Sequence, residues 1–368
     1  MLIEHSLRSG ARLASLVAIA FTAQLLMADE YGQINLVSDV PGMAAHTDPN
    51  LKNPWGVSFA PASPFWVSNQ VTGTSTLYTG TGTKVPLTVS IPLGNPTGQV
   101  FNSTKGFKLS DGSKALFIFD TLSGTIDGWN GGAGTTALQV VSKPGALFTG
   151  LALAADRLYA ADATGHIRVY NSSFHPVTLS GGFKDPNAIA GFVPFNIEAI
   201  HGDLYVTYAE LTSHGTGLPG GYVDVFHTNG DFVRRVATGG PLYAPWGMTV
   251  APAGFGSFGK DLLVGNFGNG EILAYDPTTG AFLGTLNDEH GHPIVNDFLW
   301  TLAFRTGGSG VNTNALYFTA GINNQKDGVF GSIIPTPEPG AFLLVAAGLA
   351  GLALLKRRKR RALEQHPD

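Results

Sequence analysis

A short apolar segment that ends in asparagine or aspartate recurs along the chain and constrains its fold more than any other feature. Four copies carry the polar residue at the fifth position, and two copies are degenerate. In chain order the six copies occupy residues 65–69, 116–120, 158–162, 204–208, 262–266 and 316–320. The intervals between successive fifth positions are 51, 42, 46, 58 and 54 residues. Self-similarity at this spacing is typical of a repeat architecture.

Every copy has similar surroundings. A strand precedes it, and in most units a glycine-containing turn and a third strand follow, since glycine supplies the positive φ that tight hairpins need. Fourth strands are predicted at 85–91, 138–141 and 232–236. The first, innermost strands are predicted at 56–59, 106–109, 150–153, 197–200, 247–250 and 301–304. Six four-stranded units predict an all-β fold, a six-bladed β-propeller; the alternative is an open array of β-sandwich units.

The ends of the repeat region predict how the ring closes. The last unit has three strands and finishes near Ile334, while the segment Gln33–Val37 is a strand without a unit. We expect this N-terminal strand to complete the last blade, because pairing the two ends leaves no long bare sheet edge.

Two stretches of the body resemble known families. The segment Leu158–Tyr170, with Asp162, Gly165 and Arg168, is similar to the NHL repeat of six-bladed propellers. The stretch Asp48–Gly56 resembles an uncharacterised family of exported bacterial propellers, which implies no established activity.

The C-terminus has three ordered parts. They are Pro337-Glu338-Pro339, an uncharged run from Ala341 to Leu355, and the six cations of Lys356–Arg361. As a helix, residues 340–355 would span roughly 24 Å, short of the roughly 30 Å hydrocarbon core, so a transmembrane helix needs bilayer thinning or snorkelling. The basic residues predict a cytoplasmic C-terminus. The alternative is a buried terminal helix followed by a basic tail.

This tripartite order resembles the bacterial PEP-CTERM sorting signal. The resemblance implies a Gram-negative, often biofilm-forming host and a membrane-embedded exosortase that recognises the motif and cuts near it. The residues that carry the resemblance are Pro337, Glu338, Pro339, Arg357 and Arg358 within the C-terminal segment 335–368. It also implies a protein of the cell envelope, cell surface or extracellular space that is transiently anchored in the inner membrane.

The N-terminus agrees with export. Arg8 and Arg12 precede an uncharged run from Leu13 to Ala28, which predicts a signal peptide over residues 1–28 and use of the Sec machinery. The alternative is a retained N-terminal anchor. The predicted organisation is therefore a signal peptide (1–28), a propeller (29–334) and a sorting segment (335–368).

Composition excludes some functions. The chain has no cysteine, so an exported body must be held by its own core without disulfides. The formal net charge is −4, although the C-terminal run contributes six positive charges, so the body is more acidic than the sum. A nucleic-acid partner is not expected, because no basic face is available to neutralise phosphates.

Propeller geometry predicts where a ligand binds. The loops entering the first strands and those joining second to third strands lie on one face, where Asn53, Trp55, Asn196, Trp246 and Trp300 converge. Glu198, two residues after Asn196, belongs to the same set of candidate ligand-binding residues at this mouth. Tryptophan side chains around a central mouth favour flat apolar or sugar-like ligands. The alternative is that the three tryptophans plug the ring as core.

Glu198 is the only carboxylate in the predicted innermost strands, where an unpaired charge is costly. With Asn196, Asp120 and Asp162 it could form an all-oxygen Ca²⁺ site. Calcium-dependent lactonases of six-bladed propeller type use a comparable set, although only the general ligand types match here. The alternative for Asp120 and Asp162 is hairpin-turn chemistry, in which the side chain bonds to nearby backbone.

Two function classes follow. The first is a binding or structural module of the cell surface or biofilm matrix, with a glycan or protein ligand. The second is a divalent-cation-dependent lactonase or lyase whose site is the central channel. Nucleophilic catalysis has no sequence support, because G-x-S-x-G, H-E-x-x-H and phosphate-loop motifs are absent.

Overall fold

The computed structural model describes residues 30–212 and 217–336. The predicted signal peptide, the sorting residues from Pro337 to Arg358 and the predicted membrane helix lie outside these ranges. Contacts divide the chain into one unit, Tyr31–Ile334, and a second unit made of Met1–Glu30 and Pro335–Asp368. The fold described below is that of the first unit.

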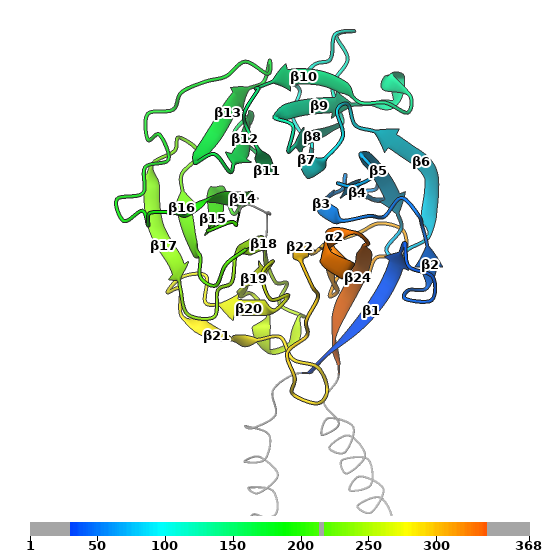
Figure 1. The fold of residues 1–368 in the computed structure, drawn as a ribbon, viewed down its shortest axis with the longest axis vertical. Helices are drawn as coiled ribbons and strands as arrows, with labels where there is room; N and C mark the ends of the chain where they lie inside the picture. Colours follow the sequence, from blue (N-terminus) through cyan, green and yellow to red (C-terminus); the bar gives the residue numbers. More distant parts are fainter. Residues whose placement is uncertain (1–29, 213–216, 337–368) are drawn as a thin grey trace, which may run out of the picture. The chain divides into compact units, whose positions relative to one another are not determined.

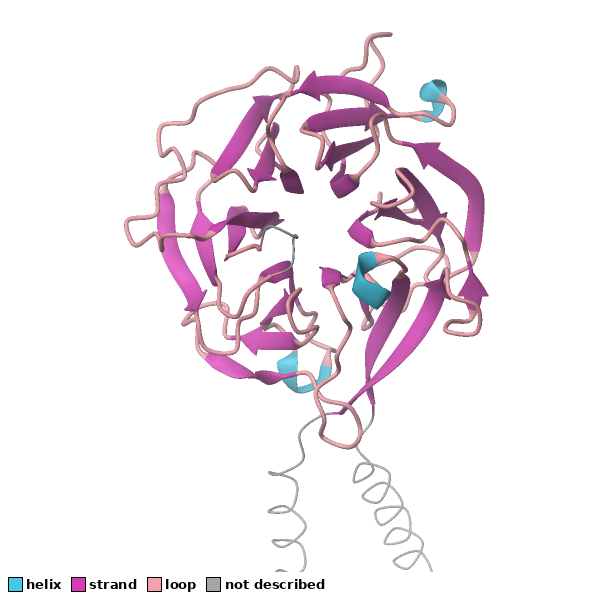
Figure 2. Cartoon of the chain, viewed as in Figure 1, coloured by secondary structure: helices cyan, strands magenta, loops and turns pink. Residues whose placement is uncertain are grey.

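Six sheets are arranged around a central axis, which confirms the predicted six-bladed propeller (Figure 1). Figure 2 shows that strands dominate residues 30–212 and 217–336, and that helix within these ranges is confined to short turns. These turns are η1 (Gly131–Ala133), η2 (Gly256–Phe258) and α2 (Ile322–Gln325).

Each blade is a meander whose first strand lies nearest the axis. Blades 1 and 2 consist of β3 (Pro54–Ser58), β4 (Phe65–Asn69), β5 (Thr74–Tyr78) and β6 (Lys84–Ser90), then β7 (Pro96–Phe101), β8 (Phe117–Thr121), β9 (Thr125–Trp129) and β10 (Leu138–Ser142). Blades 3 and 4 consist of β11 (Phe148–Ala154), β12 (Arg157–Asp162) and β13 (His166–Asn171), then β14 (Val193–Ile200), β15 (Asp203–Ala209), β16 (Tyr222–Phe226) and β17 (Phe232–Thr238). Blade 5 consists of β18 (Pro245–Val250), β19 (Leu262–Asn266), β20 (Ile272–Tyr275) and β21 (Phe282–Thr285).

The sixth blade joins the two ends of the propeller. It contains β22 (Leu299–Ala303), β23 (Leu316–Ala320) and β24 (Val329–Thr336), followed by β1 (Glu30–Ser38) and the short β2 (His46–Thr47). Strand β1 lies between β24 and β2 (Figure 1), as predicted for the N-terminal strand. The ring is therefore closed by hydrogen bonding between segments about 300 residues apart.

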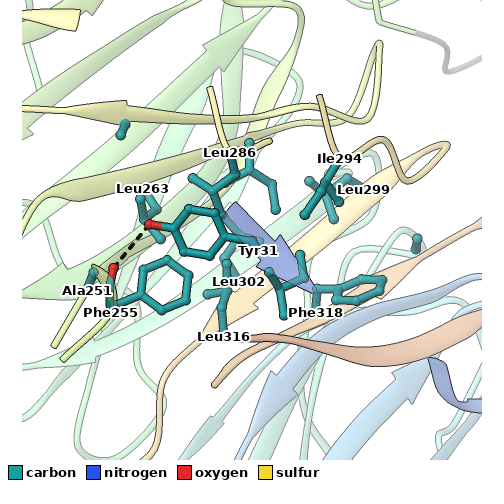
Figure 3. Close-up of a cluster of buried hydrophobic side chains, with 14 of the residues drawn as sticks. Tyr31, Ala251, Phe255, Leu263, Leu286, Ile294, Leu299, Leu302, Leu316 and Phe318 are labelled. Carbon is teal, nitrogen blue, oxygen red and sulfur yellow. Dashed lines mark hydrogen bonds between the residues drawn. The ribbon is translucent and has the colours of Figure 1, made fainter. Parts of the chain in front are cut away.

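Tyr31 anchors the closing strand to the neighbouring blade. Its ring is 1% exposed and lies among aliphatic residues of blades 5 and 6, including Leu263 and Leu302 (Figure 3). Its hydroxyl donates to the carbonyl of Phe255 at 3.1 Å, and its backbone N–H donates to Asn287 O at 3.0 Å. Strand β1 thus stabilises two blades together.

The six innermost strands share an irregularity near their first residues. Each pairs with its second strand through a register shift, between Pro54 and Val57 in blade 1 and at matching places in the others. In four blades the irregular stretch contains a glycine, namely Gly56, Gly98, Gly150 or Gly247, where the innermost strand lies close to that of the next blade. A Cβ on Gly247 would lie 2.2 Å from Trp300 O, and one on Gly98 would lie 2.4 Å from Leu151 N. Glycine at this position therefore sets how closely the blades meet at the axis.

Substituting Gly247 with alanine tests this close approach. We expect the free energy of unfolding to fall by about 3 kcal/mol, the upper range for overpacking, because the obstructing atom is backbone and cannot rotate away. Gly307→Ala is the control, since Gly307 has open space around its Cβ position. Urea unfolding of both variants measures the difference, and equal stabilities would contradict this view of the axial packing.

The prediction for the first strand of blade 2 was wrong. Residues 106–109 were expected to form it, but β7 is Pro96–Phe101 and residues 102–116 make an excursion between β7 and β8. Phe107 is fully buried in this excursion, with a φ of 57°, and packs on Phe174. Burial of apolar residues in a loop imitated the pattern of a core strand.

Blade 3 also differs from the expected four strands. Within residues 30–212, its sheet ends at β13, and only an isolated bridge between Tyr170 and Pro176 continues it. Blade 5, in contrast, has the expected fourth strand, β21, for which the sequence analysis gave no residue range.

Candidate functional site

Aromatic side chains block the axis of the propeller. This aromatic plug consists of Trp55, Phe195, Trp246, Phe267 and Trp300. The rings of Trp55 and Trp300 stack with centroids 3.5 Å apart, and Trp246 meets both edge-on. Trp246 and Trp300 are only 2% and 1% exposed. The position of these two tryptophans agrees with the plug alternative rather than with a half-exposed ligand platform.

Polar side chains tie the plug to the surrounding blades. Trp246 Nε1 donates to Thr149 O at 2.9 Å across the axis, and Asn196 Nδ2 donates to Trp246 O at 2.9 Å. Thr301 Oγ1 donates to Trp55 O at 2.8 Å. Because these bonds connect different blades, the plug is a fixed partition rather than a loose cluster.

The partition separates two cavities. The innermost strands all begin on one face, here the upstream face, and end on the other, the downstream face. An upstream pocket of about 470 Å³ is lined by residues at the starts of these strands, such as Trp55 and Thr149. A downstream cavity of about 410 Å³ is lined by the second halves of all six innermost strands, including Glu198 on β14.

Three amides border the upstream pocket. Asn53, with a left-handed φ of 44° that asparagine tolerates, accepts at its carbonyl from Gln70 N at 3.1 Å. Asn53 Nδ2 donates to Gln70 Oε1 at 3.0 Å and to Gln325 Oε1 at 3.4 Å. Trp300 Nε1 donates to Asn53 Oδ1 at 2.9 Å, so the plug orients the amide cluster.

Trp55 connects the plug to this pocket. It is 5% exposed and lines the pocket together with Asn53 and the apolar residues Leu122, Leu147 and Phe195. Its Nε1 is buried and lacks a hydrogen-bond partner in the described part of the chain. A buried donor without a partner costs free energy unless a ligand or water accepts its proton.

Glu198 lies on the other side of the partition. It is half-buried in the downstream cavity, and burial raises its pKa to about 8 against the opposing effect of a hydrogen bond from Asn196. Glu198 and Asn196 also line a small chamber of about 10 Å³ beside the plug, together with Gln99, Trp246 and Thr301.

The two aspartates of the expected calcium set line neither of these cavities. Asp162 lies in a hairpin turn, where hydrogen bonds from Leu147 N, Thr164 and Arg168 outweigh burial and hold its pKa below the ordinary value. Asp120 accepts from Thr97 Oγ1 at 2.8 Å, and burial raises its pKa to about 7. Within residues 30–212 and 217–336, His, Cys, Asp and Glu form no group of three that could hold a metal ion.

Only some of the predicted site residues line the same cavity, and some residues of the two cavities were not predicted. Asn53 and Trp55 do meet at one pocket, whereas Asn196 and Glu198 lie on the far side of the plug. Gln70, Gln325 and Gln99 were not among the predicted site residues. Gln70 directly follows the repeated segment 65–69, and Gln99 follows a Pro-Thr-Gly triplet in register with Pro54-Trp55-Gly56, so both carried a positional signal.

The C-terminal sequence matches a known sorting motif. Residues 335–360 match the model of the PEP-CTERM protein-sorting motif. Together with the fold, this match defines an exported, exosortase-sorted protein with a six-bladed β-propeller body. No helix in the described ranges is long and apolar enough to cross a membrane.

Two relatives from Acanthamoeba polyphaga mimivirus cover most of the chain. Uncharacterized protein R648 is 33% identical over 323 residues, covering 81% of this chain and 78% of the relative. Uncharacterized protein L690 is 32% identical, covering 81% of this chain and 84% of the relative. The chain belongs to the same family as these two proteins.

A solved structure with low sequence identity is similar in fold. It is a structural-genomics protein of unknown function from Bacteroides thetaiotaomicron VPI-5482, with a TM-score of 0.53 and 12% identity. The match covers 83% of this chain and 76% of that one.

Proposed function

We propose that the protein is a binding module of the cell surface or extracellular matrix that holds a neutral glycan in the upstream pocket. The observation that carries the proposal is the combination of Trp55, whose Nε1 has no partner among the described residues, with the amides of Asn53 and Gln70 in one pocket. An aromatic ring beside fixed amides suits a pyranose, which presents an apolar face and hydroxyl groups at its edge.

The charge of the pocket favours a neutral ligand. Among the described residues that line it, the polar side-chain groups are amides, hydroxyls and the indole N–H of Trp55, and none is a carboxylate, ammonium or guanidinium group. A charged ligand would lose its hydration there without gaining an opposite charge. The volume of about 470 Å³ lies within the range of small-molecule sites, enough for one or two sugar units.

The sorting signal supports a role outside the cell. An exosortase-sorted protein reaches the envelope, and β24 ends at Thr336, directly before Pro337-Glu338-Pro339. Cleavage near this motif would release or transfer the propeller with its strands intact. A rigid face with a preformed pocket then serves as a glycan-binding element of a surface or biofilm matrix.

A glycan array tests the proposal with the full chain and three variants. We expect wild-type protein to bind a subset of neutral glycans, and Gln70→Ala and Trp55→Phe to bind the same glycans about tenfold more weakly, since each loses a hydrogen bond to the ligand. Gln139→Ala is the control, because Gln139 is an exposed amide on β10. Binding only to charged glycans or to proteins, or equal binding by all variants, would contradict the proposal.

A further inference from the structure

The downstream cavity has one ionisable group in an otherwise uncharged wall. All six innermost strands contribute to its lining, and Glu198 is the sole titratable residue among the described residues that form it. Apolar side chains, including Phe59, Phe101, Leu153 and Met248, share the rest of the wall with uncharged polar groups. A carboxyl group in such surroundings lacks a counter-ion, which is costly for its charged form.

Gln99 adds a second acceptor beside the carboxyl group. Its Nε2 donates to Gly56 O at 2.6 Å and to Trp66 O at 2.7 Å, which uses both amide protons and fixes the side chain. Its Oε1 is buried and has no partner within the described ranges. Gln99 and Glu198 line the same cavity and the same small chamber, so two oxygen acceptors face a space that ends at the plug.

The neighbouring donors are already committed elsewhere. Thr301 Oγ1 donates to Trp55 O, and Asn196 Nδ2 donates to Trp246 O besides bonding to Glu198. Both of these donors are therefore used within the protein, while Gln99 Oε1 and Glu198 remain as acceptors at the inner end of the cavity. The hydroxyl of Ser58, elsewhere in the lining, also has no partner within the described ranges. A ligand that brings several N–H donors and a positive charge complements the two acceptors.

We propose that the downstream cavity binds a small organic ammonium ion, with its –NH₃⁺ group at Glu198 and Gln99 Oε1 and its hydrocarbon part against the apolar side chains of the wall. The volume of about 410 Å³ is within the range of small-molecule sites. This site lies on the opposite side of the plug from the upstream pocket and does not depend on glycan binding there.

An organic cation fits this cavity better than a divalent metal ion. Calcium takes six to eight oxygen ligands, usually with several carboxylates. The described lining offers a single carboxylate, that of Glu198, whereas such a site usually has several. An alkylammonium ion needs only a few acceptors and gains from burying its apolar part.

Binding of the cation should depend on pH through Glu198. Burial raises the pKa of Glu198 to about 8, so the carboxyl group is mostly neutral at pH 6 and increasingly ionised as the pH rises. None of the described lining residues on β3, β7, β11, β18 and β22 titrates. Other titratable groups lie in the segments that connect the innermost strands to the second strands, or at the first residue of a second strand. They are Lys105, Lys108, Asp111, Lys114, Asp156, Arg157, His201, Asp203, Lys260, Asp261 and Arg305.

Calorimetric titration of the full chain with n-hexylammonium, beside the neutral 1-hexanol, tests the proposal. We expect hexylammonium to bind wild-type protein, and its affinity to rise roughly fiftyfold from pH 6 to pH 8, the ratio of the ionised fractions of a group with a pKa near 8. Glu198→Gln should weaken binding about tenfold or more at pH 8 and remove the pH dependence. Loss of the pH dependence in this variant would assign it to Glu198 and not to the neighbouring His201. Hexanol should bind weakly and equally to both proteins.

Two controls keep the result interpretable. Glu210→Gln removes an exposed carboxylate that follows β15 of the same blade and should bind hexylammonium like wild type. A thermal melt of Glu198→Gln shows whether the variant is folded, and the pH profile of wild-type protein tests the proposal if it is not. The proposal is overturned if hexylammonium and hexanol bind alike, if the pH profile is flat, or if Ca²⁺ stabilises wild-type protein through Glu198 while hexylammonium does not bind.

Discussion

Replacing Tyr31 with alanine should lower the free energy of unfolding by about 3–5 kcal/mol, the usual cost of truncating a buried aromatic side chain. Tyr31 is 1% exposed and lies in a core cluster built from blades 5 and 6 (Figure 3). The truncation would remove these contacts and the hydrogen bond to Phe255 O. Such a loss is a large part of a typical native stability of about 5–15 kcal/mol.

Two further variants of β1 separate closure of the ring from other effects. Tyr31→Phe keeps the ring and loses only the hydroxyl, so about 1 kcal/mol is expected. Ile34 lies on the same strand and is 49% exposed, so Ile34→Ala should change stability by less than about 0.5 kcal/mol. Urea unfolding followed by far-UV circular dichroism measures all three. A Tyr31→Ala variant as stable as Ile34→Ala would mean that β1 does not hold the ring closed.

Replacing Trp300 with alanine should also lower the free energy of unfolding by about 3–5 kcal/mol. Trp300 is 1% exposed, stacks on Trp55 with centroids 3.5 Å apart and lies 4.3 Å from the ring of Phe267. Removing it leaves a cavity at the centre of the partition. Its Nε1 also orients Asn53, so the amide cluster of the upstream pocket should lose its arrangement.

Trp300→Phe and Leu283→Ala serve as comparisons for this variant. The phenylalanine keeps much of the stacking and should cost less than the alanine, while Leu283 is 47% exposed on β21 and should be nearly neutral. Urea unfolding and glycan binding are measured on the same preparations. A Trp300→Ala protein that keeps its stability would contradict the role of the plug as central core.

The architecture could be predicted from the sequence because it rests on repetition. Six copies of one segment set the number of blades, and the strand Gln33–Val37 without a unit indicated the closure that β1 and β24 make. The predicted innermost strand of blade 2 was wrong because Phe107 and Leu109 are buried in a loop, while the true innermost strand contains Thr97 and Gln99. Their polar side chains bond to other blades, a use that an apolar pattern does not reveal.

The candidate site was predictable only in part. The shared register of Trp55, Trp246 and Trp300 placed them correctly near the axis, yet whether they formed a platform or a plug depended on how closely the blades approach. That distance is set by Gly247 and its equivalents, whose effect appears only in three dimensions. For the same reason Glu198, two residues after Asn196, was grouped with the mouth although the plug separates it from the upstream pocket.

Proton–nitrogen correlation spectra of the tryptophan indoles test most directly the central claim, that a neutral glycan binds the upstream pocket at Trp55. The chain has five tryptophans, and Trp55→Phe identifies the resonance of the Trp55 indole. Trp66 and Trp129 lie in a separate core cluster between blades 1 and 2. Addition of an array-selected glycan should shift the Trp55 resonance and leave those of Trp66 and Trp129 unchanged. An unshifted Trp55 resonance at saturating glycan would contradict the claim.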